Sequence, residues 1–494
     1  MQGRKSNSFR LLDATVHLVS QNHYTRDEAP SNTIRFSLNE NDNNDSTWVT
    51  ILIGRNGIGK SRFLAAIADV FYRLSESTKI PSRNRSEVVL RYLANGAEVC
   101  LKSLNGKFKI HVNGEPVSDL GKVPVPSKVI AITTTPFDKF RISNLRANAV
   151  FGSSSNCYEY LGLRDRSGRA YALAPLMRAV EGLFNLSSER ARRLDRIAGV
   201  FNFLGFEPRI EVTYRAKASL LSELLEDDPL KFSKSLNQYA PYGGGVSDED
   251  YQALIKAARI FVAKSLDGHT VSIGSDFETH ENDGGLYSLL EPLRKLRVIL
   301  PVGVLINRQD GIKVDLLSAS SGEMSLVTAF LGLASVIQDG SLILIDEPEV
   351  SLHPEWQSGY IDLLQKTFAD YKNCHFVIAT HSPLIVADID ASNSNVVVME
   401  RNASADIEST DISGKSSDHI LATAFQTPGK NNLYLRQEII KALRLAADGE
   451  VRSEEFQSTV DWLVGLLPKL DDEPSVSRVI MNLQEVAIDA GDEK

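Results

Sequence analysis

The glycine-rich segment ILIGRNGIGKS, residues 51–61, constrains the fold more than any other part of the chain. Apolar residues run directly into Gly54-x4-Gly59-Lys60-Ser61, and apolar residues recur after it at helical spacing: Phe63, Leu64, Ile67, Phe71 and Leu74. This pattern predicts a buried strand, a glycine loop and a helix, in that order. The alternative, a chance glycine turn, does not account for both flanks.

This order of elements suits the binding of a nucleoside triphosphate. Glycines allow backbone N–H groups to point at a chain of phosphates, and the N-terminus of the following helix adds partial positive charge. In such loops the lysine reaches the β- and γ-phosphates, and the hydroxyl after it binds Mg²⁺. We therefore expect Lys60 to bind phosphate and Ser61 to bind Mg²⁺.

A pair of carboxylates follows a second apolar run, LILIDEP at residues 342–348. Such a run indicates a buried parallel strand, and ligands bind at the carboxyl ends of these strands. Asp346 fits the acid on the Mg²⁺ side of the site, and Glu347 fits a group that orients or activates the attacking water. An ordinary solvated strand end is the alternative, which the glycine loop in the same chain disfavours.

A third apolar run, residues 375–379, ends in Thr380-His381-Ser382-Pro383. A histidine at the end of a central strand is well placed to sense a γ-phosphate, and the alternative is a histidine that only caps or packs. Two further segments surround the carboxylates: SSGE at residues 320–323 precedes a run with helical spacing, and SLHP occupies residues 351–354.

Composition bounds the class of protein. The 494 residues suggest two to four domain-sized units, and 43% hydrophobic with 24% charged residues is ordinary for a soluble globular chain. No apolar run approaches about 18 residues, and the N-terminus lacks a signal-peptide pattern. Three separated cysteines, Cys100, Cys157 and Cys374, fit a reducing compartment without disulfides. We expect a cytoplasmic protein that has no membrane partner.

The chain divides into four parts. Residues 1–142 carry predicted strands and Asn-Gly turns, which favour an antiparallel sheet beside the nucleotide core. Residues 143–299 are expected to be a mostly helical insertion, residues 300–402 the second half of the core, and residues 403–494 a helical acidic tail. The predicted strands are 9–19, 34–38, 48–53, 88–93, 98–101, 107–112 and 129–132, and the turns are Asn95-Gly96, Asn105-Gly106 and Asn113-Gly114.

The net charge of −9 is unevenly distributed. Residues 137–217 hold 14 Lys/Arg against 8 Asp/Glu, whereas residues 445–494 hold 12 acidic against 4 basic residues. One interpretation is that both segments form solvated faces. The functional alternative makes the basic stretch a surface for nucleic-acid phosphates and the acidic tail a docking surface for a partner.

Taken together, these motifs resemble those of ABC-type ATPases of the SMC-like and OLD-like kind rather than transporters. GRNGIGKS (54–61) resembles Walker A, SSGE the signature loop, LILIDE (342–347) Walker B, SLHP the D-loop, and ATHSP (379–383) the switch-histidine motif. The resemblance implies an α/β ATPase head, with a P-loop core sheet and an antiparallel β-subdomain. The signature departs from the family's usual form. TTTPFDKF (133–140) also stands where a glutamine is expected, with Asp138 or Lys139 as candidate replacements.

The family mechanism implies two heads that dimerise head-to-tail around two ATP molecules, each with Mg²⁺. Lys60, Glu347 and His381 would be catalytic, and Ser61 and Asp346 would hold the metal. Residues from both heads would contact the nucleotide: Gly54, Arg55, Asn56, Gly57, Gly59, Lys60, Ser61 and Arg62 from one, and Ser320, Ser321, Gly322 and Glu323 from the other.

The sequence of residues 420–436, ILATAFQTPGKNNLYLR, is similar to that of PtuA. PtuA is the ATPase subunit of Septu-type antiphage systems, including those that accompany retrons. This implies regulation of a separate HNH-type nuclease, with a reverse transcriptase and its RNA, or DNA, as further partners. Two alternatives remain. One is an SMC-like ATPase that clamps DNA in repair or chromosome maintenance. The other is a nuclease in its own right, for which Asp388 and Asp390 form the only nearby Asp-x-Asp pair, without a recognisable Toprim domain after it.

Overall fold

The structure is a computed structural model. It describes residues 7–17, 31–36, 47–76, 87–104, 106–142, 157–164, 173–184, 190–239, 246–281, 283–316, 318–400, 403–470 and 473–492.

A seven-stranded sheet in the order β17-β16-β3-β15-β14-β8-β9 forms the core. Neighbouring strands in this sheet are parallel, except that β17 is antiparallel to β16. Every residue of β3, β8, β14 and β15 is buried, which explains why their sequences are mostly apolar. The strands are β3 (Trp48–Ile53), β8 (Val129–Thr133), β9 (Tyr158–Leu161), β14 (Leu342–Asp346), β15 (His375–Ala379), β16 (Ser394–Glu400) and β17 (Ala403–Ile407).

A second, antiparallel sheet lies beside the core, in the order β2-β1-β4-β5-β6-β7. The expected antiparallel subdomain is therefore confirmed. Asn95-Gly96 and Asn113-Gly114 both have positive φ angles, as tight hairpin turns require, while Asn105 lies outside the described residues. The strands are β1 (Phe9–His17), β2 (Ser31–Arg35), β4 (Glu87–Ala94), β5 (Ala97–Leu104), β6 (Lys107–Val112) and β7 (Glu115–Val117).

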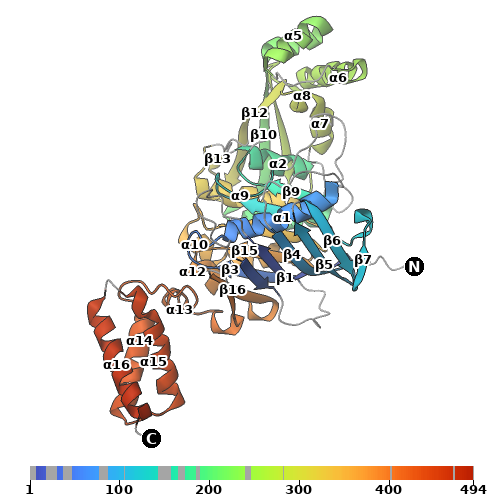
Figure 1. Cartoon of the computed structure of the whole chain (residues 1–494). Helices are drawn as coiled ribbons and strands as arrows, with labels where there is room; N and C mark the ends of the chain where they lie inside the picture. Colours follow the sequence, from blue (N-terminus) through green and yellow to red (C-terminus); the bar gives the residue numbers. More distant parts are fainter. Residues whose placement is uncertain are drawn as a thin grey trace.

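Helix α1 (Lys60–Glu76) shares one hydrophobic cluster with both sheets. Figure 1 shows it running alongside β4, β5 and β6. Because its first residue follows directly from the glycine loop, this packing fixes the loop at the carboxyl end of β3.

The insertion contains strands that the helical prediction missed. A four-stranded antiparallel sheet, β11-β10-β12-β13, takes β10 and β11 from the insertion, and it continues through β12 and β13 past the predicted boundary at residue 299. Alternating burial along β10 is the pattern of a half-buried strand, but this run stands between helical segments. Strand β9 also lies within the expected insertion, yet it pairs with β8 of the core.

Helices α2 and α3 share a hydrophobic cluster with α9 of the C-terminal half, so the insertion and the core are packed as one. The remaining elements of this region are α2 (Leu173–Phe184), α3 (Arg190–Phe203), β10 (Phe206–Ala216), α4 (Ala218–Leu225), α5 (Pro229–Tyr239), α6 (Asp248–Lys264), β11 (Thr270–Asp276), α7 (Gly284–Leu289), α8 (Glu291–Lys295), β12 (Ile299–Arg308) and β13 (Lys313–Asp315).

The predicted helical tail, residues 403–494, begins with strand β17, which the prediction missed, and is helical from α13 onward. Three of its helices, α14, α15 and α16, enclose a small core of their own. Figure 1 shows them at one end of the molecule, with α5 and α6 of the insertion at the other. The tail helices are α13 (Ser417–Thr423), α14 (Leu433–Ala447), α15 (Glu454–Leu466) and α16 (Pro474–Asp492).

The helices of the C-terminal half of the core are α9 (Ser321–Val336), α10 (Pro354–Ser358), α11 (Tyr360–Thr367) and α12 (Pro383–Ala387). The short 3-10 helices are η1 (Leu120–Lys122), η2 (Ala391–Asn393), η3 (Ser409–Asp411) and η4 (Leu467–Lys469). Among the described residues, no helix combines the length and apolar character needed to cross a membrane.

A buried polar network around His375 joins the two sheets. The Leu11 N–H of β1 donates to His375 Nδ1 at 3.1 Å, so this nitrogen carries no proton. The other nitrogen, Nε2, therefore donates to Thr50 Oγ1 of β3 at 3.0 Å, and Thr50 donates to Asn395 Oδ1 of β16 at 2.7 Å. Burial holds the pKa of His375 well below its usual value. The network needs a neutral histidine.

This requirement predicts a pH-dependent stability. In the unfolded chain His375 takes up a proton near its ordinary pKa of about 6.5, while in the folded chain it does not. Below that pH the unfolded state therefore binds more protons, and folding stability falls. Relative to His375→Gln, which keeps a donor and an acceptor but does not titrate, the wild type should lose up to about 1.4 kcal/mol per pH unit between pH 6 and 5. Urea unfolding across this range measures the difference, and parallel profiles would contradict the account.

Candidate active site

The glycine loop packs closely against β16. A Cβ atom on Gly54 would lie 2.6 Å from the Met399 carbonyl oxygen. Gly57 and Gly59 have φ angles of +79° and +109°, which side-chain-bearing residues rarely adopt. The glycines of the predicted loop are therefore required by both space and backbone conformation.

Lys60 is the buried cation of the site. Its side chain lies at the first turn of α1, and the residue is only 4% exposed. The ammonium donates to the Gly54 carbonyl oxygen at 2.8 Å and to His381 Nε2 at 2.7 Å. Burial lowers its pKa to about 8, although the nearby carboxylates of Glu347, Glu349 and Asp346 act in the opposite direction. A phosphate group would provide the negative charge that this position favours.

Asp346 ends β14 and is 2% exposed. Its Oδ1 atom has no hydrogen-bond partner, and the Ser61 hydroxyl bonds to the carboxylate. Burial raises the pKa of Asp346 to about 7. A buried oxygen without a partner is unusual and suits a cation. Oxygen ligands from Ser61 and Asp346, completed by phosphate and water, fit Mg²⁺.

Glu347 is held in a strained backbone conformation. Its φ angle is +50°, and for a residue other than glycine this region costs roughly 1–3 kcal/mol. Two hydrogen bonds of 2.9 Å support it: the Glu347 N–H donates to the Ala379 carbonyl, and the Thr134 hydroxyl donates to the Glu347 carbonyl. The side chain is 31% exposed, and its Oε1 lies 3.8 Å from His381 Nε2. It is the accessible carboxylate at this edge of the sheet.

His381 follows β15 and meets the other groups through its ring. Burial, together with the charge of Lys60, lowers the pKa of His381 to about 4. The ring is therefore neutral near pH 7 and accepts the Lys60 proton donor. The structure thus brings together five predicted residues from the ends of strands β14 and β15 and the start of helix α1: Lys60, Ser61, Asp346, Glu347 and His381.

The signature loop caps α9. The Ser320 hydroxyl accepts from the Glu323 N–H, and the Glu323 carboxylate accepts from the Ser320 N–H. Glu323 also forms an ion pair with Arg308 at 2.7 Å. Its nucleotide contact stays a prediction, and the structure gives it a capping role. Ser320 and Ser321 are exposed at the start of the helix.

Gly322 is packed within its own chain. A Cβ atom there would lie 2.4 Å from the Ser351 carbonyl oxygen of the D-loop-like segment. A larger residue would therefore push the signature and this segment apart. Ser351 itself has a φ angle of +69°.

Asp138 does not replace the missing glutamine. Its carboxylate accepts from Arg164 Nε at 2.9 Å and from the Tyr160 hydroxyl at 2.8 Å, and it caps the Phe140 N–H at 2.9 Å. Asp138 therefore ties the segment after β8 to β9 and is not available to a nucleotide. The suggestion of Asp138 was wrong because the sequence did not reveal β9 as its neighbour.

Two residues near the site were missed. Thr134 fixes the Glu347 backbone, and Glu349 accepts hydrogen bonds from Thr380 and His381. The second glutamate of Glu347-Pro348-Glu349 was the available signal for Glu349.

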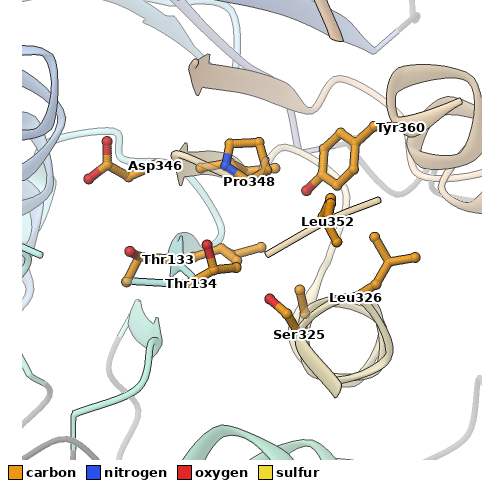
Figure 2. Close-up of a pocket in the computed structure, with 11 residues that line it drawn as sticks. Thr133, Thr134, Ser325, Leu326, Asp346, Pro348, Leu352 and Tyr360 are labelled. Atoms are coloured by element: carbon orange, nitrogen blue, oxygen red, sulfur yellow. The ribbon is translucent and has the colours of Figure 1, made fainter. Parts of the chain in front are cut away.

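A small cavity lies behind the carboxylates, as Figure 2 shows. Thr133 and Thr134 at the end of β8 border it together with Asp346, and Ser325 and Leu326 of α9 border it from the helix side. Its lining does not include the glycine loop or Lys60. The cavity therefore adjoins the metal-side carboxylate without being the phosphate position.

Comparison with known families identifies the domain. Residues 148–387 match the family described as "AAA domain, putative AbiEii toxin, Type IV TA system". This part of the chain is therefore similar to an AAA-type ATPase domain. The matched region includes the signature, Asp346, Glu347 and His381 but begins after the glycine loop. That loop is assigned from its own geometry.

Curated relatives come from bacteria and a phage. The retron Ec83 probable ATPase of Escherichia coli is 30% identical over 125 residues, 23% of this chain and 22% of the relative. The retron Vc95 probable ATPase of Vibrio cholerae serotype O1 biovar El Tor is 22% identical over 390 residues, 70% of this chain and 68% of the relative. Protein ea59 of Escherichia phage lambda is 36% identical over 94 residues, 19% of this chain and 18% of the relative. The matches therefore span about a fifth of the Ec83 ATPase and of ea59.

Solved SMC heads align along most of the chain with low similarity. The SMC head domain from Thermotoga maritima has a TM-score of 0.32 and 15% identity, covering 81% of this chain and 98% of that one. The SmcHead bound to the C-winged helix domain of ScpA has a TM-score of 0.33 and 11% identity, covering 80% and 97%.

The geometry predicts that Lys60→Ala removes most ATP binding. Loss of the ammonium removes charge-assisted hydrogen bonds to phosphate, for which a roughly 10- to 100-fold weaker affinity is expected. Calorimetric titration with ATP and Mg²⁺ measures the change. Lys366→Ala is the matched control, because this lysine is 75% exposed and pairs only with Asp362 on its own helix. Unchanged affinity in Lys60→Ala would exclude the phosphate role.

Proposed function

We propose that the chain binds and hydrolyses ATP with Mg²⁺, and that two copies pair head-to-tail to complete the site. One observation carries this proposal: Lys60, Glu347 and His381 converge at the carboxyl ends of adjacent strands. His381 Nε2 lies 2.7 Å from Lys60 Nζ and 3.8 Å from Glu347 Oε1. A cation for phosphate, a carboxylate for water and a neutral imidazole at one point suit phosphoryl transfer to water.

Each side chain has a distinct task in this mechanism. Lys60 exchanges His381 and the Gly54 carbonyl for phosphate oxygens, and His381 contacts the γ-phosphate. Glu347 orients the attacking water and accepts its proton. Ser61 and Asp346 would hold Mg²⁺, whose bound charge offsets that of the phosphates.

The exposed start of α9 supports a second copy. Ser321 is exposed at the positive end of a 16-residue helix, where an anion is favoured, while the Ser320 N–H is already bound by Glu323. Gly322 lies against Ser351 of its own chain. In a head-to-tail pair, each α9 would cover the γ-phosphate bound by the other copy, giving two equivalent sites.

This arrangement predicts a trapped dimer. Glu347→Gln removes the proton acceptor, so ATP should still bind while hydrolysis falls roughly 100-fold or more. The ATP that is not hydrolysed should then hold two chains together, and mass photometry should detect the dimer. Adding Ser321→Arg should block approach of the heads and return the variant to monomers with ATP affinity retained. Ser458→Arg, at an exposed position on α15, is the matched control and should leave the dimer intact. A Glu347→Gln protein that stays monomeric with ATP would refute the shared site.

We further propose a role in antiphage defence of the Septu or retron kind, in which the ATPase dimer regulates a separate HNH-type nuclease. Two curated relatives are named as retron probable ATPases, which supports this assignment. The tail supports a docking role, because its helices have their own core and residues 445–494 are strongly acidic. Further partners would be a reverse transcriptase with its RNA.

Affinity purification of the chain from its native host, followed by mass spectrometry, tests the partner. Recovery of a nuclease, or of a reverse transcriptase with RNA, is expected, and removal of residues 433–492 should abolish it. Recovery of the chain alone would contradict the partner assignment and leave the ATPase assignment standing.

An SMC-like DNA clamp is the second candidate, favoured by the basic stretch at residues 137–217. Two of its arginines are already used internally: Arg141 pairs with Asp69 at 2.8 Å and Arg164 pairs with Asp138. DNA affinity that requires ATP and falls steeply with salt would favour the clamp.

The alternative of a nuclease within this chain gains no support from its Asp-x-Asp pair. Asp388 Oδ2 accepts from the Asp362 N–H at 2.9 Å, and Asp390 Oδ1 accepts from the Ser392 N–H at 3.0 Å. Both carboxylates therefore cap backbone N–H groups. Among the described residues, no group of three or more His, Cys, Asp or Glu side chains is arranged to hold a metal.

A further inference from the structure

Three carboxylates lie at the end of β14 and just beyond it, and their surroundings differ. Asp346 has an oxygen without a partner, beside Ser61. Glu347 reaches toward His381 and is 31% exposed. Glu349 has both oxygens engaged by β15's exit loop. The first suits a metal and the second suits water, but the third has no oxygen left for either.

Glu349 binds the main chain and side chain of the loop that carries the histidine. Its Oε1 accepts from the His381 N–H at 2.5 Å, and its Oε2 accepts from the Thr380 hydroxyl at 2.9 Å. Charge-assisted hydrogen bonds of this kind are about twice as strong as neutral ones. They fix the backbone on the N-terminal side of the His381 Cα atom.

Three further hydrogen bonds hold the same loop. The Thr380 hydroxyl also accepts from the Ser382 N–H at 3.0 Å, and the Thr380 N–H donates to the Leu52 carbonyl of β3 at 3.0 Å. The Ser382 hydroxyl donates to Gln357 Oε1 of α10 at 2.7 Å. Glu349 is the charged member of this set and the one that holds the His381 N–H itself.

We propose that Glu349 is a positioning residue for hydrolysis, which acts by orienting His381 toward the γ-phosphate. The inference rests on the proposed function, because it needs His381 to contact phosphate. Glu349 does not touch the reacting atoms. Its effect passes through the backbone of His381, with the Thr380 hydroxyl as the second contact.

Glu349→Gln tests the proposal. An amide oxygen accepts one of the two hydrogen bonds, while the NH₂ group faces a second donor, so the loop should lose its fixed position. We expect kcat to fall roughly 10-fold or more, with ATP affinity within about threefold of wild type, since the Lys60 contacts are intact. Glu249→Gln, an exposed glutamate on α6, is the matched control and should change neither.

A double-mutant cycle separates positioning from general support of the fold. If Glu349 acts through His381, then Glu349→Gln should reduce kcat by less than about twofold in a His381→Ala background. Thr380→Ser keeps the hydroxyl and should resemble wild type, while Thr380→Val should show part of the defect. Equal losses of kcat in both backgrounds would overturn the positioning role.

Hydrogen exchange gives a second readout that does not depend on residual activity. Glu349→Gln should speed exchange of the peptide containing residues 380–382, with the rest of the core sheet unchanged. Unchanged exchange there would overturn the proposal, and so would faster exchange throughout the core. Wild-type hydrolysis that depends on His381 but not on Glu349 refutes this inference alone. Absence of hydrolysis, or full kcat in His381→Ala, refutes the proposed function as well.

Discussion

A single buried cation organises this molecule's chemistry. The Lys60 ammonium lies among the charges of Glu347, Glu349 and Asp346 and donates to His381 Nε2. Withdrawing an ammonium from water is costly unless negative charge surrounds it. Three carboxylates near one lysine offset part of this cost, although burial still lowers the pKa of Lys60 to about 8. The ammonium donates hydrogen bonds to His381 and to the Gly54 carbonyl, and under the proposed function phosphate oxygens would replace these two acceptors.

The parallel sheet makes this convergence possible. Strands β3, β14 and β15 are neighbours that run in the same direction, so the residues after each of them emerge at one edge. The His375 network ties these strands to the antiparallel sheet and keeps them in register. The strained backbone of Glu347 persists because bonds from Thr134 and Ala379 hold it there.

The parts of the fold that the sequence predicted were those with strong local patterns. Apolar strands, Asn-Gly turns and the glycine loop each depend on nearby residues, and the structure contains the strands, the loop and the turns at Asn95-Gly96 and Asn113-Gly114. Strands β10 and β11 were missed because they lie between helices, and pairing between distant segments leaves little local trace. For the same reason, the partners of Asp138 and Glu349 could not be read from spacing, since Arg164 and His381 are distant in sequence.

The central claim is that each ATP site needs two copies of the chain. The most direct measurement is ATPase activity per chain, recorded across protein concentrations at which mass photometry follows monomer and dimer in the same ATP and Mg²⁺ buffer. The account predicts that activity per chain rises in proportion to the dimer fraction and is nearly absent from monomers. Full activity per chain in a population that is monomeric throughout would contradict it.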